Sequence, residues 1–268
     1  MTTLHAMENH MKREKGTRGL EGAVNGASIW NGRRVAITGG TSGLGRALVT
    51  ALHDSGARVA FVARNHEPVE SLVHDRPRSH GIVGDVSSKA EIYPLAIQIL
   101  GALGGLDILI NNASSLGSVP LVPLGDTNCE DLELAIQTNL LGPFRLTKAL
   151  LGSLAISARD GRRPVVVNIS SDAAINAYPN WGAYSVSKAG LHHLSRIWDQ
   201  ELASHHIRIL SIDPGDMDTP LHALAVPEAD PSTLKRPENA AKDIMRAIEN
   251  LIAAPGASPG DQIQEVIS

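Results

Sequence analysis

A tyrosine, a lysine and a serine have the types and spacing of an acid–base site. Tyr184 and Lys188 lie four positions apart, and Ser171 lies 13 residues before the tyrosine. Positions i and i+4 share one face of a helix, so the ammonium group would lie beside the phenol. We expect this cation to favour the phenolate and to lower the pKa of Tyr184 from about 10. The phenol would then act as a general acid or base near neutral pH, whereas an exposed Tyr–Lys pair without a role is the alternative.

Ser171 follows the apolar segment 164–169, where a buried strand is expected to end. The end of this strand and the start of the next helix can bring the hydroxyl groups of Ser171 and Tyr184 to one carbonyl oxygen. The three side chains together therefore predict proton transfer to or from a substrate oxygen.

Three glycines follow the first apolar segment and precede a helix-length segment. Gly39 permits a tight turn, Gly43 lets the backbone approach a phosphate, and Gly45 lets helix and strand pack closely. The amino end of the helix offers free N–H groups and a positive dipole end to a pyrophosphate. A glycine-rich turn without a ligand is the alternative, but the position between strand and helix favours dinucleotide binding. The expected cofactor contacts in this turn are Gly39, Thr41, Ser42, Gly43 and Leu44.

The end of the second expected strand selects the cofactor. NAD sites place Asp or Glu about 20 residues after the glycines, on the ribose 2′-hydroxyl. Residues 59–65 contain no acid, and Arg64 lies just past the apolar segment. An arginine there can pair with the 2′-phosphate of NADP(H), so we expect NADP(H) as the cofactor. A solvated surface arginine is the alternative.

Polar and small residues end the next two strands. Asp85 and Val86 follow the third strand, where a carboxylate could accept a hydrogen bond from the adenine amino group or cap the next helix. Asn111 ends the fourth strand and can tie it to its neighbour. Asn112 and Ala113 follow, and small residues there let a flat ring lie against the backbone. We expect Asp85, Val86, Asn112 and Ala113 to contact the cofactor.

These residues need a parallel sheet to position them. Short apolar segments rich in Val and Ile alternate with helix-length segments, as expected for strands buried on both faces. This alternation predicts an α/β fold with a single Rossmann-type, doubly wound parallel sheet of six to seven strands flanked by helices. The expected strands are 33–38, 57–62, 80–84, 106–111, 164–169 and 207–212. The expected helices are 43–55, 87–103, 129–158, 181–204 and 237–253.

The combined motifs resemble the short-chain dehydrogenase/reductase family over about residues 32–255. The matching segments are TGGTSGLG (38–45), NNAS (111–114), Asn139, ISS (169–171), YSVSK (184–188) and DPG (213–215). The resemblance implies a dinucleotide-binding domain over residues 32–268 that acts on a small-molecule carbonyl or alcohol substrate. It also implies a homo-oligomer, either a dimer or a tetramer.

The resemblance assigns four catalytic roles. Tyr184 would protonate the substrate oxygen in reduction or deprotonate an alcohol in oxidation, and Ser171 would hydrogen-bond that oxygen. Lys188 would lower the pKa of Tyr184 and hold the nicotinamide ribose, so both residues are also expected to contact the cofactor. Asn139 would hold a water near the lysine in a proton relay. The cofactor contacts implied on the nicotinamide side are Pro214, Gly215 and Thr219.

Three features depart from the family pattern. NNAS replaces the usual NNAG, so Ser114 would narrow the floor of the site. Ser42 occupies the position where a basic residue often precedes the middle glycine, which leaves the preference for the 2′-phosphate largely to Arg64. Residues 256–268 lack the common Gly-Gly ending, although 261–267 could still form a short seventh strand.

Composition excludes several other classes of protein. The chain has 268 residues, 43% of them hydrophobic, which suits one domain with a sizeable core. A net charge of −4 gives no basic field for nucleic acid or a membrane surface. The single cysteine, Cys129, excludes an internal disulfide, and we expect no metal ion despite 11 histidines. Residues 1–31 lack an apolar period and a signal-peptide core, which predicts a flexible tail on a cytoplasmic protein.

The leading function is an NADP(H)-dependent oxidoreductase, with a carbonyl reductase favoured because NADPH is normally the reducing pool. A non-catalytic dinucleotide-sensing protein, an NAD-dependent alcohol dehydrogenase, and an isomerase or dehydratase are the alternatives. A sensor has no need for the catalytic set, and isomerase relatives usually carry a longer substrate domain. Residues 217–233 are expected to form a mobile lid. The expected substrate pocket is moderately apolar and comprises Leu116, Val119, Tyr178, Trp181, Met217 and Leu221.

Overall fold

The computed structural model describes residues 28–253 and 265–266. They form a seven-stranded parallel sheet in the order β3-β2-β1-β4-β5-β6-β7, which confirms the predicted Rossmann-type α/β fold. Ligands of such sheets bind outside the carboxyl ends of the strands, at the point where the strand order reverses, here between β1 and β4. The strands are β1 (Arg34–Thr38), β2 (Arg58–Ala63), β3 (His80–Val83), β4 (Ile108–Asn111), β5 (Val165–Ile169), β6 (Arg208–Asp213) and β7 (Glu265–Val266).

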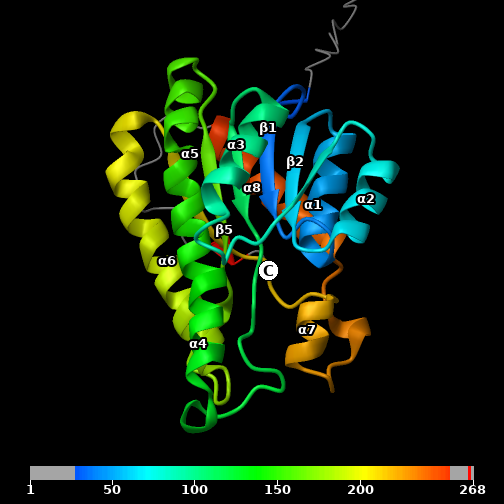
Figure 1. Cartoon of the computed structure of the whole chain (residues 1–268), viewed down its shortest axis with the longest axis vertical. Helices are drawn as coiled ribbons and strands as arrows, with labels where there is room; N and C mark the ends of the chain where they lie inside the picture. The colour runs from blue at the N-terminus through cyan, green and yellow to red at the C-terminus, as the bar shows by residue number, and fades with distance from the viewer. Residues whose placement is uncertain (1–27, 254–264, 267–268) are drawn as a thin grey trace, which may run out of the picture.

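Helices cover both faces of this sheet (Figure 1). Helices α1, α2 and α8 pack on one face, and α3, α5 and α6 pack on the other. Successive strand residues alternate between the two layers, with Val35 and Ile37 in the first and Ala36 in the second. Within the described residues, no helix is long and apolar enough to cross a membrane. The helices are α1 (Gly43–Asp54), α2 (His66–Asp75), α3 (Ile92–Leu103), α4 (Cys129–Ile136), α5 (Gly142–Arg159), α6 (Gly182–Leu202), α7 (Pro220–Ala225) and α8 (Pro237–Ala253).

Four helical segments differ from the sequence prediction. Helices α2 and α7 were not predicted, because α2 buries only Val69 and Leu72 and the short α7 buries no residue fully. Helix α3 begins at residue 92 rather than 87, since the chain first makes a turn in which Asp85 accepts a hydrogen bond from the Ser87 N–H at 2.8 Å. The single helix expected over 129–158 is divided into α4 and α5 by a π-helical turn, Gln137–Leu141.

The boundary of the folded domain lies before residue 31. Trp30 is 1% exposed in the core between α1 and α8, and its indole N–H donates a hydrogen bond to Glu249. The last residues of the expected tail therefore belong to the packed domain, and the boundary predicted after residue 31 is wrong. A chain that begins at Asn31 would lose this buried ring. Residues 1–27 of the expected tail lie outside the described residues.

Candidate active site

A cavity of about 700 Å³ lies at the carboxyl ends of β4, β5 and β6. It contains three of the four expected catalytic residues, Ser171, Tyr184 and Lys188. Helix α7 extends from the body of the molecule beside this edge of the sheet (Figure 1), and Leu221 in α7 lines the cavity. The other expected site residues that line it are Leu44, Asn112, Leu116, Tyr178, Trp181, Pro214, Gly215, Met217 and Thr219.

Val119 does not line this cavity, contrary to the sequence prediction. Its side chain is 51% exposed, because the chain after β4 turns outward before it reaches α4. The expected lid, 217–233, contributes residues to the cavity and includes α7. Mobility of this segment stays a prediction.

Lys188 is buried beneath the ring of Tyr184. It is 2% exposed, and its Nζ lies 5.5 Å from the centroid of the Tyr184 ring. The same Nζ donates a hydrogen bond to the Ile169 carbonyl oxygen at 2.7 Å. Burial lowers the pKa of Lys188 to about 8, although the charge of Asp213 acts in the opposite direction. The one-face arrangement predicted from the i,i+4 spacing is therefore present.

The expected lowering of the Tyr184 pKa is wrong for this structure. Burial of the phenol raises its pKa to about 12, because removal from water disfavours the phenolate. Hydrogen bonds from Ser171 and Ser114 favour the phenolate, whereas the charges of Asp213 and Asp172 oppose it. The ammonium group of Lys188 is directed to a backbone carbonyl and does not cancel the effect of burial. Tyr184 is consequently protonated at neutral pH.

Ser171 combines a structural and a chemical role. Its Oγ accepts a hydrogen bond from the Ala173 N–H at 3.2 Å and so begins a short 3-10 turn after β5. The hydroxyl also donates to Asp172 Oδ1 at 3.2 Å. Because Ser171 contacts the phenol of Tyr184 as well, the two hydroxyl groups meet on the floor of the cavity as the sequence predicts.

Asn139 lies in the π-helical turn and is fully buried. Its Nδ2 donates to the Ser115 carbonyl oxygen at 2.7 Å and to Ser187 Oγ at 2.8 Å. Its Oδ1 accepts from the Ser115 N–H at 2.8 Å and from Ser114 Oγ at 3.2 Å. The side chain therefore ties the loop after β4 to α6, while the expected relay water stays a prediction. π-helical turns of this kind are frequent at functional sites.

Three positions of the turn after β1 suit only glycine, as expected for a turn that binds a dinucleotide. Gly39 has φ +69°, and a Cβ there would lie 2.9 Å from Ala113 Cα. A Cβ on Gly45 would lie 2.0 Å from the Gly39 carbonyl oxygen, so helix α1 could not approach the turn. Gly43 has φ +45°, and a Cβ there would meet Thr219 at 3.0 Å. Gly39 and Gly45 match the tight turn and close packing predicted for them, whereas the approach of a phosphate to Gly43 stays a prediction. Thr41 and Ser42 lie within the same turn, before the start of α1.

Hydrogen bonds between strands hold this turn against β4. Thr38 Oγ1 accepts from the N–H groups of Asn112 and Ala113, each at 3.0 Å. Asn111 Nδ2 donates to Asn168 Oδ1 at 2.8 Å, which confirms the predicted tie between β4 and its neighbour. The carboxyl ends of β1, β4 and β5 are thus fixed relative to one another.

A smaller cavity of about 90 Å³ lies beside the glycine turn. Among its described lining residues Arg64 is the only Lys or Arg, and Asp85 Oδ1 already accepts hydrogen bonds from the N–H and hydroxyl groups of Ser87 at 2.8 Å. Ser114 lines both this cavity and the 700 Å³ cavity, so the two meet there. The expected cofactor residues that line it are Gly39, Arg64, Asp85, Val86 and Ala113.

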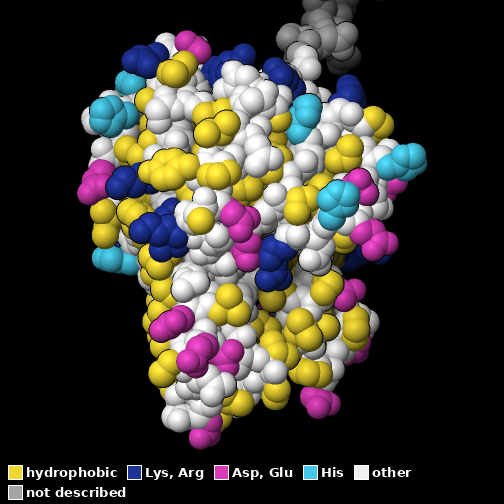
Figure 2. All heavy atoms as spheres, in the orientation of Figure 1, with side chains coloured by type: hydrophobic (Ala, Val, Ile, Leu, Met, Phe, Trp, Pro, Cys, Tyr) yellow, Lys and Arg dark blue, Asp and Glu magenta, His cyan; other side chains and the backbone are white. Residues whose placement is uncertain are grey.

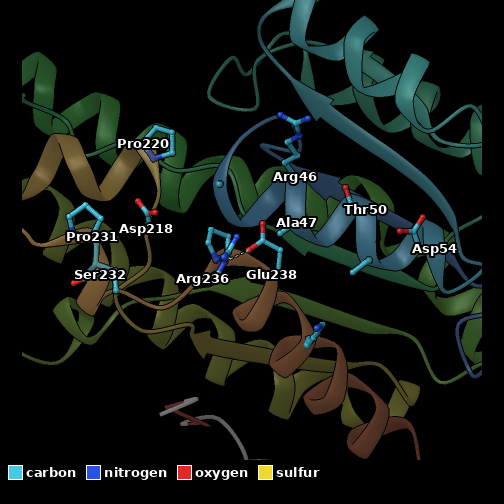
Figure 3. A pocket seen from close by; sticks show the side chains of 15 residues that line it. Arg46, Ala47, Thr50, Asp54, Asp218, Pro220, Pro231, Ser232, Arg236 and Glu238 are labelled. Atoms are coloured by element: carbon cyan, nitrogen blue, oxygen red, sulfur yellow. Dashed lines mark ion pairs between the residues drawn. The ribbon is translucent and has the colours of Figure 1, made fainter.

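A larger cavity, of about 1020 Å³, lies elsewhere, between α1, α8 and the segment that contains α7. Figure 3 shows its charged side chains from opposite walls, with Arg236 paired to Glu238 at 3.5 Å. It contains none of the four expected catalytic residues. Size alone therefore does not identify the active site.

Several polar residues of the cavity were missed by sequence reasoning as functional groups. Ser114 contacts the phenol of Tyr184, and Asp172, Asp213 and Asp216 line the same space. Asp213 ends β6, and the other three lie in loops just after a buried strand, which is the signal that could have found them. The sequence prediction treated Ser114 only as a residue that narrows the floor.

The fold and this site together define a Rossmann-type oxidoreductase that uses a nicotinamide dinucleotide. Residues 33–229 match the family described as short chain dehydrogenase. The chain belongs to the short-chain dehydrogenase/reductase family, as its motifs predict.

Known relatives and solved structures resemble most of the chain. L-xylulose reductase of Bos taurus is 30% identical over 71% of this chain and 74% of its own length. Carbonyl reductase [NADPH] 2 of Sus scrofa is 31% identical over 69% of this chain and 72% of its own. The crystal structure of a short-chain dehydrogenase from Streptomyces avermitilis has a TM-score of 0.71 at 29% identity, covering 81% of this chain and 84% of that one.

Proposed function

We propose that the protein is an NADP(H)-dependent carbonyl reductase in which Tyr184 is the proton donor. The proposal rests above all on the phenol of Tyr184, which lies beside Ser171 at the floor of the 700 Å³ cavity. A pKa of about 12 keeps this phenol protonated at neutral pH, as the reduction of a carbonyl group requires.

Each catalytic side chain then has a defined task. The nicotinamide ring, when bound, supplies the hydride. Ser171 donates a hydrogen bond to the substrate oxygen, and Tyr184 transfers its phenolic proton to the same oxygen. Lys188 stabilises the phenolate that remains, because a pKa of about 8 leaves its ammonium group charged at neutral pH. Asn139 keeps Ser114 in place beside the phenol through its buried hydrogen bonds.

The proposed preference for NADP(H) over NAD(H) is based on the residues that follow β2. Of the described residues along the small cavity next to the glycine turn, Arg64 is the only Lys or Arg, and no acid follows β2 at the position that NAD sites use. A guanidinium group matches a phosphate in a charge-assisted, bidentate contact. The Sus scrofa relative is named for its use of NADPH, which agrees with this choice.

A panel of aldehydes and ketones with NADPH or NADH tests the proposal. We expect NADPH absorbance to fall with at least one carbonyl compound, and NADPH to bind more tightly than NADH. Equal affinity for the two cofactors would contradict the NADP(H) assignment. Tight cofactor binding without turnover of any carbonyl compound or alcohol would favour a non-catalytic dinucleotide sensor. Turnover of alcohols with NAD⁺ alone would favour an NAD-dependent alcohol dehydrogenase.

A further inference from the structure

Three segments that follow β4, β5 and β6 carry carboxylates but no Lys or Arg. They are residues 112–136, 172–187 and 213–234, and each contributes to the 700 Å³ cavity. In Figure 2, the lower part of the visible face, where α4 and α7 lie, shows Asp and Glu side chains and no Lys or Arg. The acids of the three segments are Asp126, Glu130, Asp131, Glu133, Asp172, Asp213, Asp216, Asp218, Glu228 and Asp230.

This concentration is far from the average of the chain. These segments hold ten acids and no Lys or Arg, whereas the acids of the whole chain are nearly balanced by basic residues, which leaves a net charge of only −4. A cleft lined by one sign of charge concentrates ligands of the opposite sign and raises their rate of association. The approach to the cavity therefore favours a cation.

The same bias continues inside the cavity. Among its described lining residues, Asp172, Asp213, Asp216 and Asp230 face a single Lys or Arg, Lys188. The ammonium group of Lys188 is directed to the Ile169 carbonyl oxygen beneath Tyr184. The lining consequently has an excess of negative charge next to the proposed proton donor, with Asp213 partly buried and the other three carboxylates exposed.

Two of these carboxylates, those of Asp172 and Asp213, form hydrogen bonds beside Ser171. Asp172 is the next residue, and its Oδ2 accepts the Tyr178 hydroxyl at 2.6 Å. Asp213 Oδ1 accepts from the Gly215 N–H at 2.9 Å, and Ile169 pairs with Ile212 where the two strands end. Because these contacts fix the carboxylates before any ligand arrives, a cation would find them already oriented.

The arrangement suits an organic cation better than a metal ion. Within the described residues, no group of three or more His, Cys, Asp or Glu is close enough to hold a metal. Tyr178 and Trp181 line the cavity next to the carboxylates, and aromatic faces attract organic ammonium groups. Leu116 and Leu221 add apolar surface for a carbon skeleton.

We infer that the substrate is a carbonyl compound that carries a positively charged amine, bound by Asp172, Asp213 and Asp216 while Ser171 and Tyr184 hold the carbonyl oxygen. This inference deepens the proposed function and rests on it for the position of the carbonyl group. The amine recognition itself does not depend on turnover, so it can be tested separately.

Three ketones with one skeleton provide the activity test. Their end groups are a dimethylamino group, which is charged at pH 7, an isopropyl group of similar shape, and a carboxylate. With saturating NADPH, we expect kcat/KM for the amine to exceed that for the isopropyl compound by about tenfold or more, with the carboxylate lowest. Added salt should reduce this preference, because it screens the carboxylates.

A binding measurement separates this inference from the proposed chemistry. The Kd values of the amine and isopropyl compounds are measured by calorimetry with NADPH-saturated Tyr184→Phe protein, whose turnover should be about 10²–10⁴-fold slower than that of the wild type. Tighter binding of the amine supports the inference even if the wild-type protein reduces no ketone. Equal Kd values overturn it, even if the wild-type protein proves to be an active reductase.

Two sets of variants locate the effect. Asp172→Asn combined with Asp216→Asn should bring the amine-to-isopropyl ratio close to one in both measurements. Asp218→Asn is the matched control, since Asp218 belongs to the same loop but lines the other cavity, and it should leave the ratio unchanged. A ratio that survives the double substitution, or that falls equally in the control, overturns the assignment of these carboxylates.

Discussion

Carboxylates at the two ends of the sheet have pKa values that are shifted in opposite directions. At the amino end, Asp107 is 0% exposed and forms ion pairs with Arg34 at 2.6 Å and Arg162 at 3.0 Å. Burial alone would raise its pKa, but hydrogen bonds from Arg34 and Ser157 hold the pKa below its usual range. At the carboxyl end, burial raises the pKa of Asp213, and the charges of nearby aspartates add to this rise.

This difference separates carboxylates that stabilise the fold from groups that are available to bind a ligand. The amino-end carboxylates are satisfied by arginines of neighbouring strands and loops, as in the pair Asp199–Arg208 at 2.9 Å. Removal of such a partner leaves a buried charge without compensation. At the carboxyl end, Asp213, Tyr184 and Lys188 have perturbed pKa values and line a cleft, which is typical of functional sites and costs stability.

The sharpest test of the carboxyl end is Tyr184→Phe, which keeps the ring and removes only the hydroxyl. Turnover should fall by about 10²–10⁴-fold, the usual contribution of a positioned acid–base group. Stability and NADPH affinity should change little, because the buried ring still packs. Turnover under saturating NADPH, a thermal melt and a cofactor titration measure the three quantities. Turnover close to that of the wild type would remove Tyr184 from the proton transfer.

Asp107→Ala is the corresponding test of the amino end. We expect the free energy of unfolding to fall by about 3–5 kcal/mol, because Arg34 and Arg162 lose a fully buried partner. Asp107 has a lowered pKa in the folded state, so its contribution is present above the ordinary carboxyl pKa and is lost as pH falls below it. Denaturant unfolding across acidic and neutral pH measures both effects.

The control for this prediction is the nearby exposed Asp160, whose replacement by alanine should change stability by less than about 0.5 kcal/mol. Turnover per folded molecule should be unchanged in both variants. A loss of turnover in Asp107→Ala without a loss of stability would mean that the two ends do not differ in the way described.

Patterns along the chain were sufficient to predict most of the fold and the meeting of Ser171, Tyr184 and Lys188 in one cavity. Buried strands such as β5 contain only apolar residues and Asn168, so their period is easy to recognise. Helix α2 escaped prediction because most of its length faces solvent and its apolar period is weak. The burial of Trp30 depends on α8, more than 200 residues away, and no local pattern signals it.

The electrostatics of the site could not be read from spacing. The Tyr184–Lys188 spacing predicts a neighbouring cation, and the structure confirms that the two side chains lie close together. The rise in the Tyr184 pKa comes first from burial, and the charges of Asp213 and Asp172 add to it, whereas hydrogen bonds from Ser171 and Ser114 act in the opposite direction. Burial by distant parts of the chain therefore outweighs the local pair.

Arg64→Ala tests the nucleotide side of the carboxyl end. NADPH binding should weaken by about 1.5–3 kcal/mol, the usual range for a hydrogen bond to a charged group, while NADH affinity stays nearly constant. Titration of both cofactors against wild-type and variant protein measures the difference. Arg58→Ala is a suitable control, because Arg58 starts the same strand at the opposite end of the sheet. An equal loss for NADPH and NADH would show that Arg64 does not contact the 2′-phosphate.

Asp213→Asn should have the smallest effect and the opposite sign to Asp107→Ala. A raised pKa means that the folded protein binds this proton more readily than the unfolded chain, so the charged carboxylate destabilises the fold as pH rises through that pKa. The amide keeps an acceptor for the Gly215 N–H and removes the charge. At pH 7 we therefore expect the variant to be more stable by about 0.5–2 kcal/mol, the usual gain when a functional group is removed. The gain should disappear in acid, where the wild-type carboxyl group is itself protonated. A variant that is less stable than the wild type at pH 7 would place Asp213 with Asp107, among the carboxylates that hold the fold.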